Sequence, residues 1–136
     1  MEKILVDWTS NYIKNKDIMQ KTLVDLEIKE NHILCKHKNG QVTKYIVNPR
    51  LTQDAFSEIK DGQNVIVCLN TRQNIDFVIN NWQKLISYKR LSIIFANPSI
   101  NERWIIFPHT HNLISEKGAI KKGLLALFSS VEEVNV

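Results

Sequence analysis

The amino-acid sequence predicts one three-layer α/β/α domain, residues 1–136, with a mixed sheet of about six strands and the element order α-β-β-β-α-β-α-β-β-α. Three observations predict this α/β fold. Alternating patterns and a hairpin signal fill 22–47. Two continuous apolar runs, 65–69 and 91–96, flank an amphipathic helical pattern, and further helical patterns stand near both ends. No Gly-, Pro- or Ser-rich linker interrupts the chain, so we expect a single domain.

The first half of the chain predicts a helix followed by a three-stranded meander. Apolar residues recur at helical spacing over 2–15. Over 22–30 apolar and charged residues alternate, as in a strand with one face exposed to water. Two further strands flank Asn39-Gly40, which is typical of a type I′ hairpin turn because both turn positions need positive φ.

The second half predicts a strand–helix–strand unit, an edge strand and a last helix. A short helix over 52–59 comes first, and an apolar stripe from Ile75 to Ile86 predicts one long helix between the two buried strands. The right-handed crossover rule makes those two strands parallel. An edge strand is expected at 104–107, and Ser115 is expected to cap the last helix. The simplest strand order is sequential, with the second and sixth strands antiparallel to the rest.

The composition predicts a globular cytoplasmic protein. A hydrophobic fraction of 43% and a charged fraction of 24% are ordinary for such a domain. No apolar run is long enough for a signal sequence or a membrane span, so no membrane association is expected. Cys35 and Cys68 lie within apolar strand patterns, where cysteine usually acts as a small hydrophobic residue. The net charge of +4 favours a nucleic-acid partner only if the basic side chains gather on one face.

The second and third predicted strands, ILCKHK over 33–38 and VTKYIV over 42–47, contain no carboxylate. In its inferred α-β-β-β-α-β order, the chain over 1–70 is similar to the core of restriction-endonuclease-like folds, the PD-(D/E)XK nucleases and their inactive relatives. That resemblance implies an acidic residue on the second strand and a Glu/Asp-x-Lys on the third, which hold a divalent metal beside the scissile phosphate. The catalytic motif is absent from both strands, so the resemblance concerns topology alone.

Asp25, Glu27 and Lys29 share one face of the first predicted strand and contain a Glu-x-Lys. A metal site there would need a second element that brings another carboxylate across, and only Asp7 on the first helix offers one. The solvated face of an edge strand is therefore the preferred interpretation. A relocated nuclease site is the alternative.

Two pairs of zinc-ligand residue types, Cys35 with His37 and His109 with His111, are each spaced two residues apart on expected extended segments. In the sequential strand order four strand spacings of about 4.8 Å, roughly 19 Å, separate the two pairs. We therefore expect no metal site and no cofactor. His109 and His111 remain secondary candidates for a pocket or a partner contact, although a plain loop after Pro108 is preferred.

The carboxyl ends of the two parallel strands form the best-supported candidate site, because ligands of open α/β sheets usually bind there. The residues that converge at this crevice are Asn70, Thr71, Arg72 and Asn74 after the first strand, Asn97 after the second, and Arg103 at the start of the edge strand. Amides, arginines and a helix N-terminus suit an anion or a polar partner surface. The alternative is that these residues only cap the helix and form turns.

These features predict a small cytoplasmic α/β domain that acts as a non-catalytic binding or assembly module. It would dock a protein partner or a second copy through the crevice or through the edge strand at Trp104-Ile105-Ile106. The alternative is a nucleic-acid-binding domain related to PD-(D/E)XK-type nucleases, although no motif supports a nucleic-acid partner. G-x-G-x-x-G, P-loop and G-x-S-x-G motifs are absent, which disfavours the common enzymes that use them.

Overall fold

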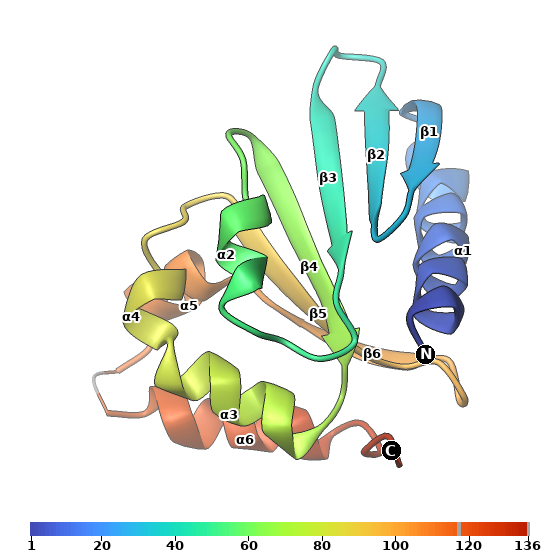
Figure 1. The fold of residues 1–136 in the computed structure, drawn as a ribbon. Coiled ribbons are helices and arrows are strands. Elements are labelled where there is room, and N and C mark those ends of the chain that lie inside the picture. Colours follow the sequence, from blue (N-terminus) through green and yellow to red (C-terminus); the bar gives the residue numbers. More distant parts are fainter. Residues whose placement is uncertain (117, 136) are drawn as a thin grey trace.

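One six-stranded mixed sheet forms the centre of the molecule in a computed structural model that describes residues 1–116 and 118–135 (Figure 1). The strands are β1 (Leu23–Lys29), β2 (His32–His37), β3 (Val42–Val47), β4 (Gln63–Leu69), β5 (Leu91–Asn97) and β6 (Glu102–Ile106). Their order in the sheet is β1-β2-β3-β4-β5-β6. β3, β4 and β5 are parallel to one another, whereas β2 and β6 are antiparallel to their neighbours. The predicted α/β fold, strand order and strand directions are confirmed.

The central strands β4 and β5 are covered on both faces, which is why their sequences are continuous apolar runs. Ile66 and Val67 point to opposite faces of β4, and at most 2% of either residue is exposed. Phe95 of β5 is fully buried, and its ring stacks on that of Trp104 with centroids 4.1 Å apart. The strands that were predicted from continuous apolar runs are therefore the best-buried part of the sheet.

A single long helix, α1 (Glu2–Gln20), covers one face of the sheet. It packs Leu5, Trp8 and Ile13 into a core cluster with Cys35 and Tyr45 of the sheet. None of the helices in the described ranges, α1 included, is long and apolar enough to cross a membrane.

The end of α1 lies beyond the predicted 2–15. The helix continues to Gln20, and Lys21 then adopts a left-handed conformation with φ of 54°. The Asp17 carboxylate accepts the backbone N–H groups of Thr22 and Leu23 at 2.9 and 2.8 Å, which ties the last turn of α1 to the start of β1. The polar sequence after residue 15 has no clear apolar period, so this extension could not be read from periodicity.

Short helices cover the opposite face, drawn to the left in Figure 1. Within the described residues they are α2 (Asp54–Glu58), α3 (Arg72–Asn80), α4 (Trp82–Leu85) and α6 (Ile120–Ser129). α2, α3, α4 and α6 contribute to a second core cluster that includes Ile66, Phe95 and Trp104. The two faces of the sheet therefore have very different covers.

The apolar stripe from Ile75 to Ile86 predicted one helix, but the structure divides it into α3 and α4. Asn81 lies between them with φ of −110° and ψ of 19°. Its side-chain amide donates to the Phe77 carbonyl at 2.8 Å, beside the backbone N–H of Asn81, and accepts from Gln53 at 2.9 Å, so it competes for a helix carbonyl at the break. The stripe still faces the core, and only the continuity of the helix was predicted wrongly.

A helix, α5 (Pro108–Ile114), replaces the loop that was expected after β6. Pro108 occupies the first turn, where its fixed φ suits a helix and its missing N–H removes no intrahelical bond. Ser115 lies at the C-terminal end of α5 and does not cap the last helix, whose N-cap is Ala119. α5 lies beside α4, where Trp82 donates to the Asn112 side chain at 3.1 Å.

Phe95→Ala should lower the free energy of unfolding by about 3–5 kcal/mol, because it opens a cavity under the stacked Trp104 ring. Urea denaturation followed by far-UV circular dichroism measures this loss. Ile18→Ala is the control, because Ile18 is 65% exposed on α1 and should cost less than about 0.5 kcal/mol. Equal losses in the two variants would contradict the described core.

Candidate functional site

At the predicted crevice, the side-chain amide of Asn70 forms hydrogen bonds within the chain. Asn70 is fully buried, and its side-chain nitrogen donates to the Val131 carbonyl at 3.0 Å. Its side-chain oxygen accepts the Trp104 indole N–H at 2.8 Å, and its backbone carbonyl accepts from Val134 at 2.9 Å. Asn70 therefore joins β4 and β6 to the segment after α6.

The other two predicted amides make equally complete internal bonds. Asn97 donates to the Glu132 carbonyl at 2.9 Å and accepts the Ser99 N–H at 3.2 Å. Asn74 accepts the Leu51 N–H and donates to the carbonyls of Pro49 and Leu69, each at 2.8 Å. These bonds organise loops at the carboxyl ends of β3, β4 and β5.

An anionic group of the chain lies at the N-terminus of α3, where the sequence predicts an anion. Thr71 caps the helix by accepting the Asn74 N–H at 3.2 Å. The Arg72 N–H donates to the Glu133 carboxylate at 3.0 Å, and the Arg72 guanidinium pairs with Asp76 at 3.2 Å. The helix N-terminus thus binds a carboxylate, and the chain supplies it.

The segment Val131–Val134 therefore occupies the crevice at the carboxyl ends of the parallel strands. Val131 and Val134 are each 7% exposed, and they pack into the clusters on opposite faces of the sheet. The segment passes around the strand ends and seals them. Of the six residues predicted at the crevice, Arg103 alone lines one of the two hollows described below.

The remaining sequence candidates do not gather into a metal or catalytic cluster. His109 contacts the Ile86 carbonyl at 2.9 Å, and His111 contacts the backbone of Phe107 at 3.1 Å, so both histidines fasten α5. Glu27 pairs with Lys29 at 3.6 Å with both side chains about half exposed. Across residues 1–116 and 118–135, no three His, Cys, Asp or Glu side chains lie close enough to share a metal ion.

The edge strand β6 buries two of the three residues predicted to dock a partner. Trp104 is 5% exposed and Ile106 is fully buried, because both face the cluster under α3 and α6. Arg103, Ile105 and Phe107 alternate with them and face the α1 side. The side chains of this strand that a ligand or partner could contact therefore lie on the α1 face.

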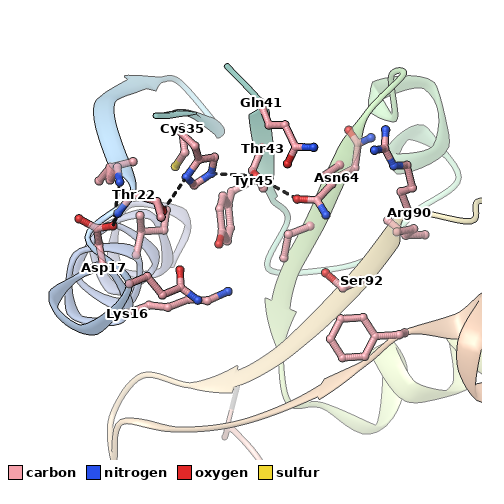
Figure 2. A pocket seen from close by; sticks show the side chains of 18 of the residues that line it. Lys16, Asp17, Thr22, Cys35, Gln41, Thr43, Tyr45, Asn64, Arg90 and Ser92 are labelled. Atoms are coloured by element: carbon pink, nitrogen blue, oxygen red, sulfur yellow. Dashed lines mark hydrogen bonds between the residues drawn. The ribbon is translucent and has the colours of Figure 1, made fainter. Parts of the chain in front are cut away.

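A pocket of about 480 Å³ lies between the C-terminal half of α1 and the amino ends of β3, β4 and β5. We call it the α1 pocket. Figure 2 shows Lys16 and Asp17 on its α1 side, Arg90 on the opposite side, and Thr43 and Tyr45 between them. Its size is within the usual range of roughly 300–1,000 Å³ for small-molecule sites.

A chain of hydrogen-bonded polar side chains crosses the α1 pocket. His37 Nδ1 lies 3.3 Å from the Thr22 hydroxyl and Nε2 lies 3.1 Å from the Thr43 hydroxyl. Thr43 in turn donates to the side-chain amide oxygen of Gln63 at 3.4 Å. Because the single Thr43 proton goes to Gln63, Thr43 accepts from His37 Nε2–H, and Nδ1 accepts from Thr22. Both ring nitrogens of His37 are thus engaged.

The apolar floor of the α1 pocket contains two weak acids that remain protonated. Burial raises the pKa of the Cys35 thiol to about 11 and holds the pKa of the Tyr45 hydroxyl well above its ordinary value. A protonated thiol is a poor nucleophile. Cys35 therefore contributes an apolar surface to the pocket.

Cationic side chains surround the mouth of the α1 pocket. Lys16 comes from α1, whereas Lys89 and Arg90 precede β5, and all three are exposed. Asp17 is the one carboxylate among the described lining residues, and its oxygen already accepts two backbone N–H groups. The mouth thus has an excess of positive charge.

A second, shallower hollow of about 780 Å³ adjoins the pocket along α1, and we call it the outer hollow. Lys14, Lys16 and Arg103 supply its positive charge. The Arg103 guanidinium lies 4.8 Å from the centre of the Tyr12 ring, which stacks on Trp8 at 5.5 Å. The Trp8 indole donates to Asn101 at 2.9 Å and joins α1 to the β5–β6 turn.

The α1 pocket and the outer hollow form one groove, which we call the α1 groove. Lys16 lines both, and the chain runs from Arg103 of β6 in the outer hollow to Phe107, just after β6, in the α1 pocket. The net charge alone did not show that these basic side chains gather on one face, because they come from three separate segments: α1, the residues before β5, and β6. Cys35 and His37, which the sequence analysis considered as metal ligands because they share one face of a strand, do line the α1 pocket.

No protein-family model, curated protein or solved structure matches this chain.

Asn70→Ala should lower the free energy of unfolding by about 2–3 kcal/mol, because it leaves the Trp104 N–H and buried carbonyls of the 131–134 segment without partners. Chemical denaturation measures the loss. Asn80→Ala, at an exposed position of α3, is the matched control and should change stability by less than about 0.5 kcal/mol. An Asn70 variant as stable as this control would show that the amide does not hold the segment.

Native Cys35 should react slowly with iodoacetamide at pH 7–8 and faster as the pH approaches 11, because the thiolate is the reacting form. The raised pKa of Cys35 also makes the free energy of unfolding depend on pH. The folded state keeps the proton longer than the unfolded chain, so its contribution is complete below pH 9 and is lost as the pH rises toward 11. Mass-spectrometric mapping of alkylated peptides measures the rate, and rapid labelling at pH 7 would contradict the described burial.

Proposed function

We propose that this chain is a non-catalytic binding domain for an anionic ligand, which binds in the α1 pocket. The carrying observation is the charge around that pocket: Lys16 on one side and Lys89 and Arg90 on the other, with Asp17 as the one carboxylate among the described lining residues. An anion between the two sides would receive charge-assisted hydrogen bonds from both.

The interior of the pocket supports a ligand with a polar body as well as a negative charge. Gln41 and Gln63 are exposed at the amino ends of β3 and β4, and each presents a side-chain amide with donors and an acceptor. Leu23 and Val65 add partly exposed apolar surface beside them. Such a mixture of apolar walls and a few polar groups is typical of small-molecule sites.

The hydrogen bonding of His37 and the protonation of Cys35 in the pocket support binding without catalysis. His37 has both ring nitrogens in hydrogen bonds to threonine hydroxyls, so neither is free to take a proton from a ligand. The Cys35 thiol is protonated at neutral pH. The two buried free thiols, Cys35 and Cys68, also fit a reducing compartment such as the cytoplasm.

Arg90→Ala and Lys16→Ala should each weaken the binding of adenosine monophosphate and pyrophosphate by about 5- to 10-fold, because each removes one charge-assisted hydrogen bond. Isothermal titration calorimetry at low ionic strength measures the affinities. Lys122→Ala, an exposed substitution on α6, is the matched control and should leave them unchanged. If Lys122→Ala weakens binding as much as Arg90→Ala, the ligand does not bind in the α1 pocket.

A further inference from the structure

The length of the cationic α1 groove exceeds what a small anion can contact. Arg103 pairs with Ala96 in the sheet, and Arg90 precedes Ala96 by six residues along β5. At about 3.3 Å per residue, the two arginines are roughly 20 Å apart along the strand direction. A single phosphoryl group cannot reach both, whereas a chain of regularly spaced phosphates can.

Lys16, which lines both hollows, adds a cation between these ends. The cations that line the groove are Lys14, Lys16, Lys89, Arg90 and Arg103, and they come from α1, the segment before β5, and β6. Asp17 is the one carboxylate found among its described lining residues, and it is committed to backbone N–H groups at the start of β1. A linear polyanion fits this distribution better than a compact one.

The lining also contains surfaces that suit nucleobases. Phe107 is 50% exposed at the pocket end, and the partly buried Tyr12 ring lies beside Arg103 in the outer hollow. Aromatic and guanidinium planes are the usual stacking surfaces for unpaired bases. The side-chain amides of Gln41 and Gln63 can bond to base edges within the pocket.

The groove geometry points to single-stranded nucleic acid as the ligand, with its phosphates along the five cations and one base in the α1 pocket. This inference rests on the proposed function and extends it to the whole groove. A duplex is the poorer fit because its bases are paired and stacked inside, so it has no free base to place in a pocket of about 480 Å³. At about 3.4 Å per stacked nucleotide, roughly six nucleotides span the groove.

Fluorescence anisotropy with labelled single-stranded oligonucleotides of roughly 3, 6 and 12 residues tests the inference in DNA and RNA arms. Affinity should rise steeply up to about six nucleotides and little beyond, and a duplex of the same length should bind at least about tenfold more weakly. If all five cations contact phosphates, the slope of log affinity against log salt concentration should be about −3.5. The two arms identify the sugar that the groove prefers.

The matched pair of variants is Lys14→Ala/Arg103→Ala and Lys121→Ala/Lys122→Ala, since each removes two positive charges and changes the net charge from +4 to +2. The first pair lies in the groove and should weaken hexanucleotide binding at least about tenfold and reduce the salt slope by about 1.4. The second lies on α6 and should change binding less than twofold. Lys14→Ala alone, which disturbs no aromatic contact, should reduce the slope by about 0.7 and remains informative if the double variant folds poorly.

Equal effects of the two double variants would overturn the inference, because binding would then follow net charge and not the groove. Tight binding of adenosine monophosphate with no gain from longer oligonucleotides would also overturn it, while the proposed small-anion site would stand. Absence of binding by pyrophosphate, adenosine monophosphate and every oligonucleotide would overturn both.

Discussion

The sheet is wider than one helix, and this difference in width determines where the protein presents an open surface. Six strands at about 4.8 Å give a sheet roughly 24 Å wide, whereas a helix with its side chains is about 10–12 Å across. One face carries several helical segments, and α1 is the helix that packs on the other among the described residues. The α1 face therefore keeps a hollow between the C-terminal half of α1 and the amino ends of β3, β4 and β5, which is the α1 pocket.

The chain closes the crevice at the carboxyl ends of the parallel strands and leaves a hollow at their amino ends. At the carboxyl ends of β4 and β5, the segment Val131–Val134 passes from one face to the other, held by Asn70 and Asn97. At the amino ends, the last turn of α1 is tied to β1 through Asp17. Polar groups at the closed end complete internal hydrogen bonds, while those at the open end face a hollow of ligand size.

The sheet was predictable because its signals are local. Alternation, the Asn39-Gly40 turn and two continuous apolar runs each specify a strand without information from elsewhere in the chain. The break at Asn81 was not predictable from the apolar stripe, because an asparagine side chain that competes for a helix carbonyl leaves the stripe intact. The same limit applies to α5, which has no long apolar period of its own.

The candidate site was harder to predict because its parts are distant in sequence. Asn70 and Asn97 were located correctly at the strand ends. Their side chains bond to backbone carbonyls within 128–132, and neither local sequence predicts that pairing. Lys16, Arg90 and Arg103 come together only when α1 is placed on the sheet. The rule that ligands bind at the carboxyl ends of parallel strands identifies one end of the sheet. It does not show whether a segment distant in sequence already occupies that end.

The central claim is that ligands bind in the α1 groove and not in the crevice that the segment 131–134 seals. Backbone-amide chemical shifts during titration with a single-stranded hexanucleotide test it most directly. The account predicts the largest changes at Lys16, Thr43 and Arg90, with Asn70 and Arg72 unmoved. Changes centred on Asn70 and Arg72 would contradict it.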